Sequence, residues 1–135
     1  MKIYICLMLV VGDRCAVNGY VEGVRELACE ILELMAEGLG VPRTSVLSNF
    51  LRDSHSDSLL RLNHYPPLVQ LVNNTNSIGF GEHTDPQILT ILRSNDVPGL
   101  QISPRDGFWV PVSPHPSTAF CVNVGDALQV FYIFI

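Results

Sequence analysis

Charged residues are scarce in this sequence, and basic residues are the scarcest. Only 16% of the 135 residues are charged, and 8 Lys and Arg against 13 Asp and Glu give a formal net charge of −5. No cluster of Lys and Arg is present to neutralise phosphates, which argues against non-specific nucleic-acid binding. Hydrophobic residues make up 47%, so a disordered tail is not expected either. The chain is expected to fold as one ordinary domain whose partner is a small molecule or a protein.

The cysteines form no C-x-x-C pair. They stand apart at Cys6, Cys15, Cys29 and Cys121. This spacing argues against a zinc site or a disulfide framework and favours free thiols in a reducing compartment. A cytoplasmic location is therefore predicted.

The first apolar run, residues 3–11, is too short to span a membrane as a helix. It follows Lys2 and has the rough outline of a signal peptide, but Asp13 and Arg14 stand where a small-x-small cleavage site is needed. We therefore favour a buried strand or the edge of a fragment for this segment. A small secreted protein is kept as the alternative.

Residues 20–39 carry the clearest helical pattern. Apolar residues recur at steps of three and four from Val21 to Leu39, and acidic residues occupy the other side. Asn18 or Gly19 is predicted to cap the start, and Gly40 lies where the helix should stop. The acidic polar face argues against a membrane-surface helix, so this element is predicted to be scaffold.

From residue 58 onward the pattern changes to short apolar runs separated by turn residues. Strands are predicted at residues 59–65, 88–92, 100–103, 108–112 and 118–124. Gly125 and Asp126 are predicted to form a turn between strands, and the polar residues 73–77 a loop. Short strands at this spacing predict an antiparallel sandwich or jelly roll.

His83 and Asp85 are the candidate metal ligands. On an extended chain, side chains two positions apart point to one face, so this imidazole and carboxylate can lie side by side. They would supply two-thirds of the facial triad of non-haem iron(II) oxygenases, and Pro86 favours the extended conformation at Asp85. His-x-Asp alone is a weak pattern, because such pairs also occur by chance on surfaces and in turns.

Several motifs around this pair occur in a specific order. They are Asn-His-Tyr-Pro-Pro at 63–67, Gly-Phe-Gly-Glu-His-Thr-Asp-Pro-Gln at 79–87, and Gly-Asp-Ala-Leu-Gln-Val at 125–130. Their order and spacing resemble the plant 2-oxoglutarate- and iron(II)-dependent dioxygenases, and their wording most resembles the gibberellin 2-oxidases. The likeness covers about residues 17–130.

The resemblance implies a role for each matching residue. His83 and Asp85 would bind iron(II), Tyr65 would hydrogen-bond the 2-oxoglutarate carboxylate, and Asn63 would line the same pocket. The implied reaction couples oxidative decarboxylation of 2-oxoglutarate to hydroxylation of gibberellin carbon 2. Fe(II) and 2-oxoglutarate are the expected cofactor and co-substrate, with ascorbate as a further candidate. The partner is then a small molecule, with no nucleic acid or membrane implied. Nothing indicates an oligomeric state.

The implied fold is mainly β with an N-terminal helix, as an incomplete double-stranded β-helix (jelly roll). We divide the chain into an atypical segment (1–16), a helical scaffold (17–57), a partial jelly-roll core (58–130) and an atypical tail (131–135). The family's second iron-binding histidine and its Arg-x-Ser motif do not follow residue 130. We therefore expect no dioxygenase turnover from the chain as written. The alternatives are a dioxygenase for another plant metabolite and a non-catalytic, β-rich metal-binding fragment.

Other polar and aromatic residues have simpler interpretations. His55 and His115 lie among Ser and Pro and are predicted to be exposed, and His64 is predicted to be structural. Phe108 and Trp109 are predicted to belong to the core or a pocket wall. Without the family context, Tyr65 would be interpreted as a half-buried strand tyrosine.

Overall fold

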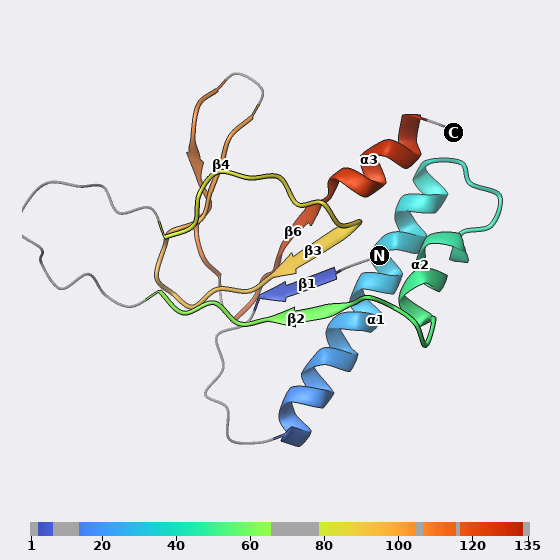
Figure 1. Cartoon of the computed structure of the whole chain (residues 1–135), viewed down its shortest axis with the longest axis horizontal. Helices are drawn as coiled ribbons and strands as arrows, with labels where there is room; N and C mark the ends of the chain where they lie inside the picture. The colour runs from blue at the N-terminus through green and yellow to red at the C-terminus, as the bar shows by residue number, and fades with distance from the viewer. Residues whose placement is uncertain (1–2, 7–13, 66–78, 105–106, 116, 134–135) are drawn as a thin grey trace, which may run out of the picture.

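The computed structural model describes residues 3–6, 14–65, 79–104, 107–115 and 117–133, so the predicted loop at residues 73–77 lies outside the described residues. The elements follow the chain in the order β1 (Ile3–Cys6), α1 (Arg14–Gly38), α2 (Ser45–Arg52), β2 (Leu59–Arg61), β3 (Leu89–Leu92), β4 (Gln101–Ile102), β5 (Val110–Pro111), β6 (Cys121–Val124) and α3 (Asp126–Ile133). Figure 1 shows their arrangement.

Helix α1 confirms the predicted amphipathic face but begins earlier than expected. Val24, Ala28 and Leu32 are buried on it, whereas Leu34 on the other side is 67% exposed. The helix starts at Arg14, so the predicted capping residues at positions 18 and 19 lie inside it. Intrinsic propensity is a weak guide when neighbouring residues supply a continuous apolar stripe.

The end of α1 lies where the glycines predicted it. Gly40 has a φ of +70°, a left-handed conformation that costs little only for glycine. Its N–H donates to the carbonyl of Glu37 at 2.9 Å, and the N–H of Val41 donates to that of Ala36, also at 2.9 Å. These two bonds form a Schellman motif, which satisfies carbonyls at the helix end. The chain can then turn back towards α2.

Helix α2 packs against α1 and is held there by polar contacts as well as apolar ones. Leu47 and Leu51 are buried in the common core. The guanidinium group of Arg25 donates two hydrogen bonds to the carbonyl of Leu51, at 2.7 and 3.0 Å. The hydroxyl of Ser48 donates to Glu33 at 2.6 Å. The two helices are therefore joined by both apolar and polar contacts.

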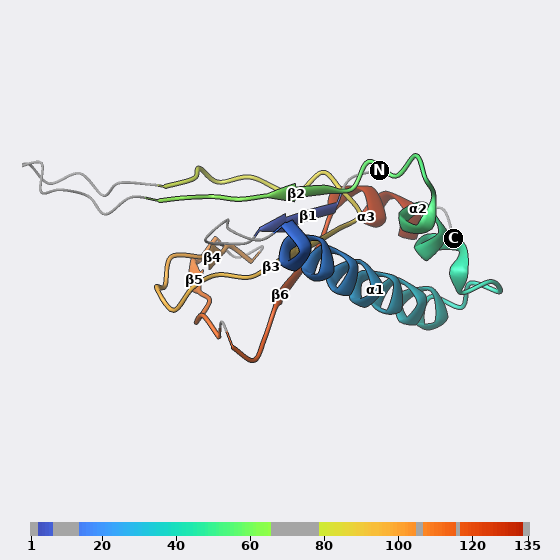
Figure 2. The ribbon, with the colours of Figure 1, turned by 90° about the horizontal axis from the view of Figure 1, so that it is seen from below.

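The main sheet has four strands in the order β2-β1-β3-β6, which lie side by side in Figure 1. Strand β1 pairs in parallel with both β2 and β3, and only the β3–β6 pair of this sheet is antiparallel. The favoured prediction of a strand near the N-terminus is confirmed for residues 3–6. Figure 2 shows α1 running along one face of this sheet.

The two faces of the sheet differ in character. Leu89 and Ile91 of β3 are fully buried and belong to the same core as α1. Thr90 and Asn123 are cross-strand partners, so the two-residue period places both on the opposite face. Through Asn123, which donates to Asp85, this face reaches the candidate site.

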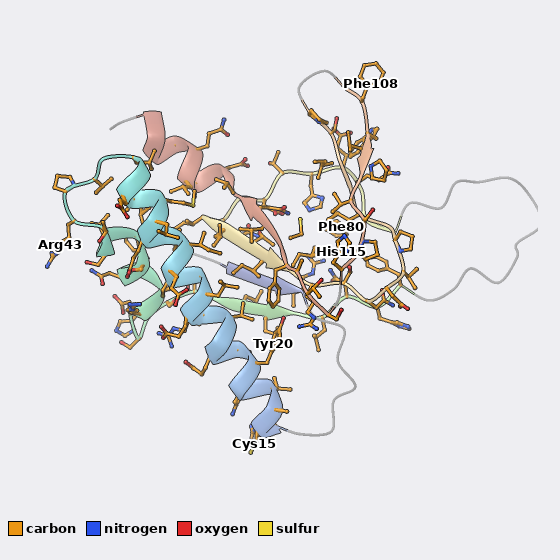
Figure 3. All side chains as sticks on the ribbon, turned by 180° about the vertical axis from the view of Figure 1, so that it is seen from behind. Cys15, Tyr20, Arg43, Phe80, Phe108 and His115 are labelled. Atoms are coloured by element: carbon orange, nitrogen blue, oxygen red, sulfur yellow. The ribbon has the colours of Figure 1, made fainter. Side chains whose placement is uncertain are left out.

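Strands β4 and β5 form a separate two-stranded antiparallel sheet. The prediction that Phe108 and Trp109 are core or pocket-wall residues is wrong as regards the core, since they are 73% and 47% exposed. Figure 3 shows Phe108 at the outer end of this hairpin, pointing away from the rest of the molecule. Gly107, with φ of +80°, turns the chain just before them. The side chains of Phe108 and Trp109 therefore contribute to the surface and not to the core.

The expectation of a mainly β chain holds only in part. Helices of 25, 8 and 8 residues outweigh strands of two to four residues among the described residues. All predicted strands are present but shorter than expected. The predicted turn at Gly125 and Asp126 is wrong in one respect, because Asp126 begins helix α3 instead of leading to a further strand. No helix in the described ranges is long and apolar enough to cross a membrane.

Candidate metal centre

His83 and Asp85 lie together immediately before β3, as their spacing predicted. The Nε2 atom of His83 is 3.6 Å from the Oδ1 atom of Asp85. This separation is too long for a hydrogen bond, so neither atom satisfies the other. The side chain of His83 is 50% exposed and that of Asp85 is 18% exposed. Two atoms of types that can bind a metal thus face the same space, on a side of the molecule that solvent can reach.

The opposite atoms of both side chains are held by hydrogen bonds. The Nδ1 atom of His83 lies 2.8 Å from the carbonyl oxygen of Gly81. A carbonyl can only accept, so Nδ1 carries the proton and Nε2 of the neutral ring keeps its lone pair. The Nδ2 group of Asn123 donates to Oδ2 of Asp85 at 3.2 Å. Both side chains therefore present one unblocked donor atom to the shared space.

The turn between β6 and α3 packs directly on the segment that carries His83 and Asp85. The main-chain N–H groups of Gly125, Asp126 and Ala127 donate to the carbonyls of Ile88, Asp85 and Gln87 at 2.9, 2.8 and 3.2 Å. In addition, the Thr84 hydroxyl donates to the Asp126 carboxylate at 2.7 Å.

The contact leaves no room for a side chain at position 125, so glycine is required there. A Cβ atom there would overlap the main-chain oxygen of Gln87 and lie 2.8 Å from that of Asp85. The backbone of the candidate centre is therefore fixed by a segment that is distant in sequence.

Phe80 and Arg61 connect His83 to the segment that carries Asn63. The rings of Phe80 and His83 meet edge to face with centroids 4.5 Å apart. The guanidinium carbon of Arg61 lies 4.9 Å above the Phe80 ring, and Nε of Arg61 donates to Oδ1 of Asn63 at 2.9 Å. Figure 3 labels Phe80, which lies at the same end of the molecule as the β4–β5 hairpin.

Tyr65 lies beyond the end of β2, although it was predicted to be within the strand. It is 56% exposed, and its ring packs so closely on Gly79 that a Cβ atom there would lie 2.9 Å from the ring. Asn63 is half-buried. Thus Asn63 is linked to the His83 ring through Arg61 and Phe80, and Tyr65 packs on the residue that precedes Phe80. His55 and His115 are exposed, as predicted.

The donor set fits iron(II) but is incomplete within the described residues. An imidazole nitrogen and a carboxylate oxygen are two of the three protein ligands of the iron(II) facial triad. No group of three or more His, Cys, Asp and Glu residues that could hold a metal occurs in the part of the chain that the structure describes. Cys121 lies near this centre, where burial, and then the charge of Asp85, raise the pKa of its thiol. Both effects favour the neutral thiol over the thiolate.

Sequence reasoning did not assign Asn123 to this site. Its pairing with Asp85 depends on β6 lying beside β3, which residue spacing alone does not reveal. The polar residues at 121 and 123, two positions apart on a predicted strand, were the one indication of a polar face. Phe80 and Arg61 were likewise missed, because ring and guanidinium contacts leave no periodic pattern.

Comparison with known protein families agrees with this chemistry. The model of the 2OG-Fe(II) oxygenase superfamily matches residues 56–133, which include every residue of the candidate centre. The chain belongs to this superfamily. The resemblance drawn from the sequence motifs is thereby confirmed at the level of the oxygenase family.

Curated relatives of this oxygenase chain carry the name that the motifs suggested. It is 59% identical over 124 residues to gibberellin 2-beta-dioxygenase 4 of Arabidopsis thaliana, covering 85% of this chain and 38% of that protein. It is 53% identical over 118 residues to the gibberellin 2-beta-dioxygenase of Phaseolus coccineus, covering 87% and 35%. Gibberellin 2-beta-dioxygenase 1 of Pisum sativum is also 53% identical, with 87% and 36% covered. The chain spans little more than a third of the length of these relatives.

Proposed function

We propose that His83 and Asp85 are iron(II) ligands of a gibberellin 2-beta-dioxygenase. The observation that carries the proposal is the convergence of His83 Nε2 and Asp85 Oδ1, 3.6 Å apart, with their opposite atoms held by Gly81 and Asn123. Outer partners of this kind orient metal ligands and fix the histidine tautomer. The superfamily match over residues 56–133 supports the same assignment.

Asn63 and Tyr65 are proposed to bind the 2-oxoglutarate co-substrate. Tyr65 is exposed enough to offer its hydroxyl to a ligand, and Asn63 is oriented by Arg61. When bound, iron(II) supplies the oxygen chemistry that couples decarboxylation of 2-oxoglutarate to hydroxylation. The protein residues hold and orient the metal and the co-substrate. A jelly-roll core of the oxygenase type is part of this proposal, supported by the antiparallel β3–β6 and β4–β5 pairs.

The proposed substrate is a gibberellin, hydroxylated at carbon 2. This assignment rests on the names of the relatives, which are 53–59% identical to the chain in the three comparisons above. A dioxygenase acting on another plant metabolite and a non-catalytic metal-binding fragment remain the alternatives. An ascorbate requirement and a cytoplasmic location stay predictions, the latter supported by the free thiols of Cys29 and Cys121.

The metal assignment is tested by anaerobic titration of the purified chain with Fe(II), and with Co(II) as an air-stable probe. His83→Ala and Asp85→Ala should each abolish saturable binding, whereas the exposed His55→Ala should leave the dissociation constant unchanged. Binding that survives both ligand substitutions would refute the assignment. Circular dichroism of each variant separates loss of a ligand from loss of fold.

Turnover is tested with the same proteins by measuring succinate formation from 2-oxoglutarate in the presence of Fe(II). Gibberellins and flavonoids are offered in parallel. Succinate formed only with gibberellins, and lost in His83→Ala, supports the proposed substrate class. Saturable metal binding without succinate from any substrate favours the non-catalytic fragment, which agrees with the expectation of no turnover from the chain as written.

A further inference from the structure

We propose that Asn123 is a positioning residue that sets the orientation of the Asp85 carboxylate for metal binding. The inference rests on the proposed function, because it concerns how one of the proposed ligands is held. It assigns a role to a strand residue that is not one of the proposed metal ligands.

The hydrogen bond from Asn123 acts on the correct oxygen of Asp85. Its Nδ2 group reaches Oδ2 at 3.2 Å, while Oδ1 is the oxygen that lies 3.6 Å from His83 Nε2. A carboxylate free to rotate would present either oxygen in several orientations. With Oδ2 held, rotation about the terminal bond of the side chain is restricted, and Oδ1 stays directed towards the histidine. The entropic cost of ordering the Asp85 side chain is then incurred on folding and not on metal binding.

The amide of Asn123 is itself oriented from the other side. The thiol of Cys121 lies 3.5 Å from Oδ1 of Asn123 and can donate to it. An oxygen that accepts there leaves the NH₂ group directed at Asp85, so the amide has one preferred orientation. Strand β6 supplies both residues two positions apart, and its pairing of Asn123 with Thr90 of β3 fixes the position of the backbone.

The contacts around Asn123 connect it to the rest of the centre. Two residues later, the N–H of Gly125 begins the series of backbone bonds onto residues 85–88, and Asp126 receives the Thr84 hydroxyl. The backbone of the ligand segment is therefore held independently of the Asn123 side chain. Removing that side chain should loosen the carboxylate without releasing the segment, which makes the role testable by substitution.

The experiment compares Co(II) binding by the full 135-residue chain and by Asn123→Ala and Asn95→Ala. Asn95 is the matched control, because its side chain accepts a local hydrogen bond from the nearby N–H of Val97 in a loop. Asn123→Ala should weaken Co(II) binding by about 10- to 100-fold, as for other outer partners of metal ligands, and Asn95→Ala by less than twofold. The d–d absorption of bound Co(II) should also change in Asn123→Ala alone. An unchanged dissociation constant for Asn123→Ala would overturn the inference.

A second measurement is made without metal. In a chain labelled with ¹⁵N-asparagine, the side-chain NH₂ signals of Asn123 are identified by their loss in Asn123→Ala. They should shift on Asp85→Ala and not on Asp96→Ala, an exposed carboxylate elsewhere. No shift on Asp85→Ala would show that the hydrogen bond is absent and overturn the inference.

The outcomes also separate this inference from the proposed function. If Co(II) binding does not depend on His83 and Asp85, the proposed metal site is wrong and the role of Asn123 is refuted with it. If binding depends on both ligands but not on Asn123, only the positioning role is refuted.

Discussion

Replacing Gly125 with alanine should destabilise the protein through a collision between two backbone segments. The new Cβ atom would overlap the carbonyl oxygen of Gln87 and lie 2.8 Å from that of Asp85. Neither atom belongs to a flexible side chain, so β6 and the ligand segment must move apart. Overpacking in a buried site costs about 1–3 kcal/mol. Weakening the three backbone bonds made by residues 125–127 adds roughly 0.5–1.5 kcal/mol for each bond lost.

We therefore expect Gly125→Ala to lower the free energy of unfolding by about 3 kcal/mol. With an m-value of about 1–3 kcal/mol/M, the urea midpoint should fall by about 1–3 M. Gly23→Ala is the matched control, because a Cβ atom there meets nothing within 4 Å and the residue lies inside α1. That substitution should stabilise the protein by roughly 0.5–1 kcal/mol, since alanine loses less backbone entropy in a helix.

Urea unfolding of both variants, followed by far-ultraviolet circular dichroism, provides the measurement. A Gly125→Ala midpoint at or above that of the wild type would show that the turn after β6 does not press on the ligand segment. The close packing described for the candidate centre would then be wrong.

Two further predictions concern the core and its thiols. Leu32→Ala removes a fully buried side chain of α1 from the common core and should lower the free energy of unfolding by about 2–5 kcal/mol in urea. A loss below about 1 kcal/mol would argue against this core. Burial raises the pKa of Cys29 and Cys121 above the ordinary value of 9.0. The unfolded thiols therefore ionise first, and stability should be complete below about pH 9 and decline as the pH rises beyond it. Urea midpoints from pH 7 to 10 should show this decline, and replacing both cysteines with alanine should reduce it; an equal decline in that variant would contradict the assignment.

The sequence predicted best those features that depend on neighbours along the chain. The burial of Val24, Ala28 and Leu32 follows from helical periodicity, and the end of α1 follows from the special backbone freedom of Gly40. The proximity of His83 and Asp85 follows from the two-residue repeat of an extended chain. In each case the deciding interaction acts over a few residues.

Features that depend on distant partners were predicted poorly. The start of α3 at Asp126 was interpreted as a turn, because Gly-Asp favours turns and the backbone bonds to residues 85–88 cannot be seen in the sequence. Phe108 and Trp109 were assigned to the core or a pocket wall, although they lie on a two-stranded hairpin outside the core. Asn123 was overlooked for the same reason, since its role exists only once β6 lies beside β3.

The position of β1 makes assembly of the main sheet conditional on one short segment. Strand β2 is hydrogen-bonded in this sheet only to β1, and β1 in turn joins it to β3. Both pairings are parallel and connect residues far apart in the chain, so they close late and slowly in folding. Whenever β1 detaches, the amides of β2 lose their pairing while the β3–β6 pair beside the candidate centre keeps its own. Hydrogen exchange in residues 59–61 would then measure how often the sheet divides.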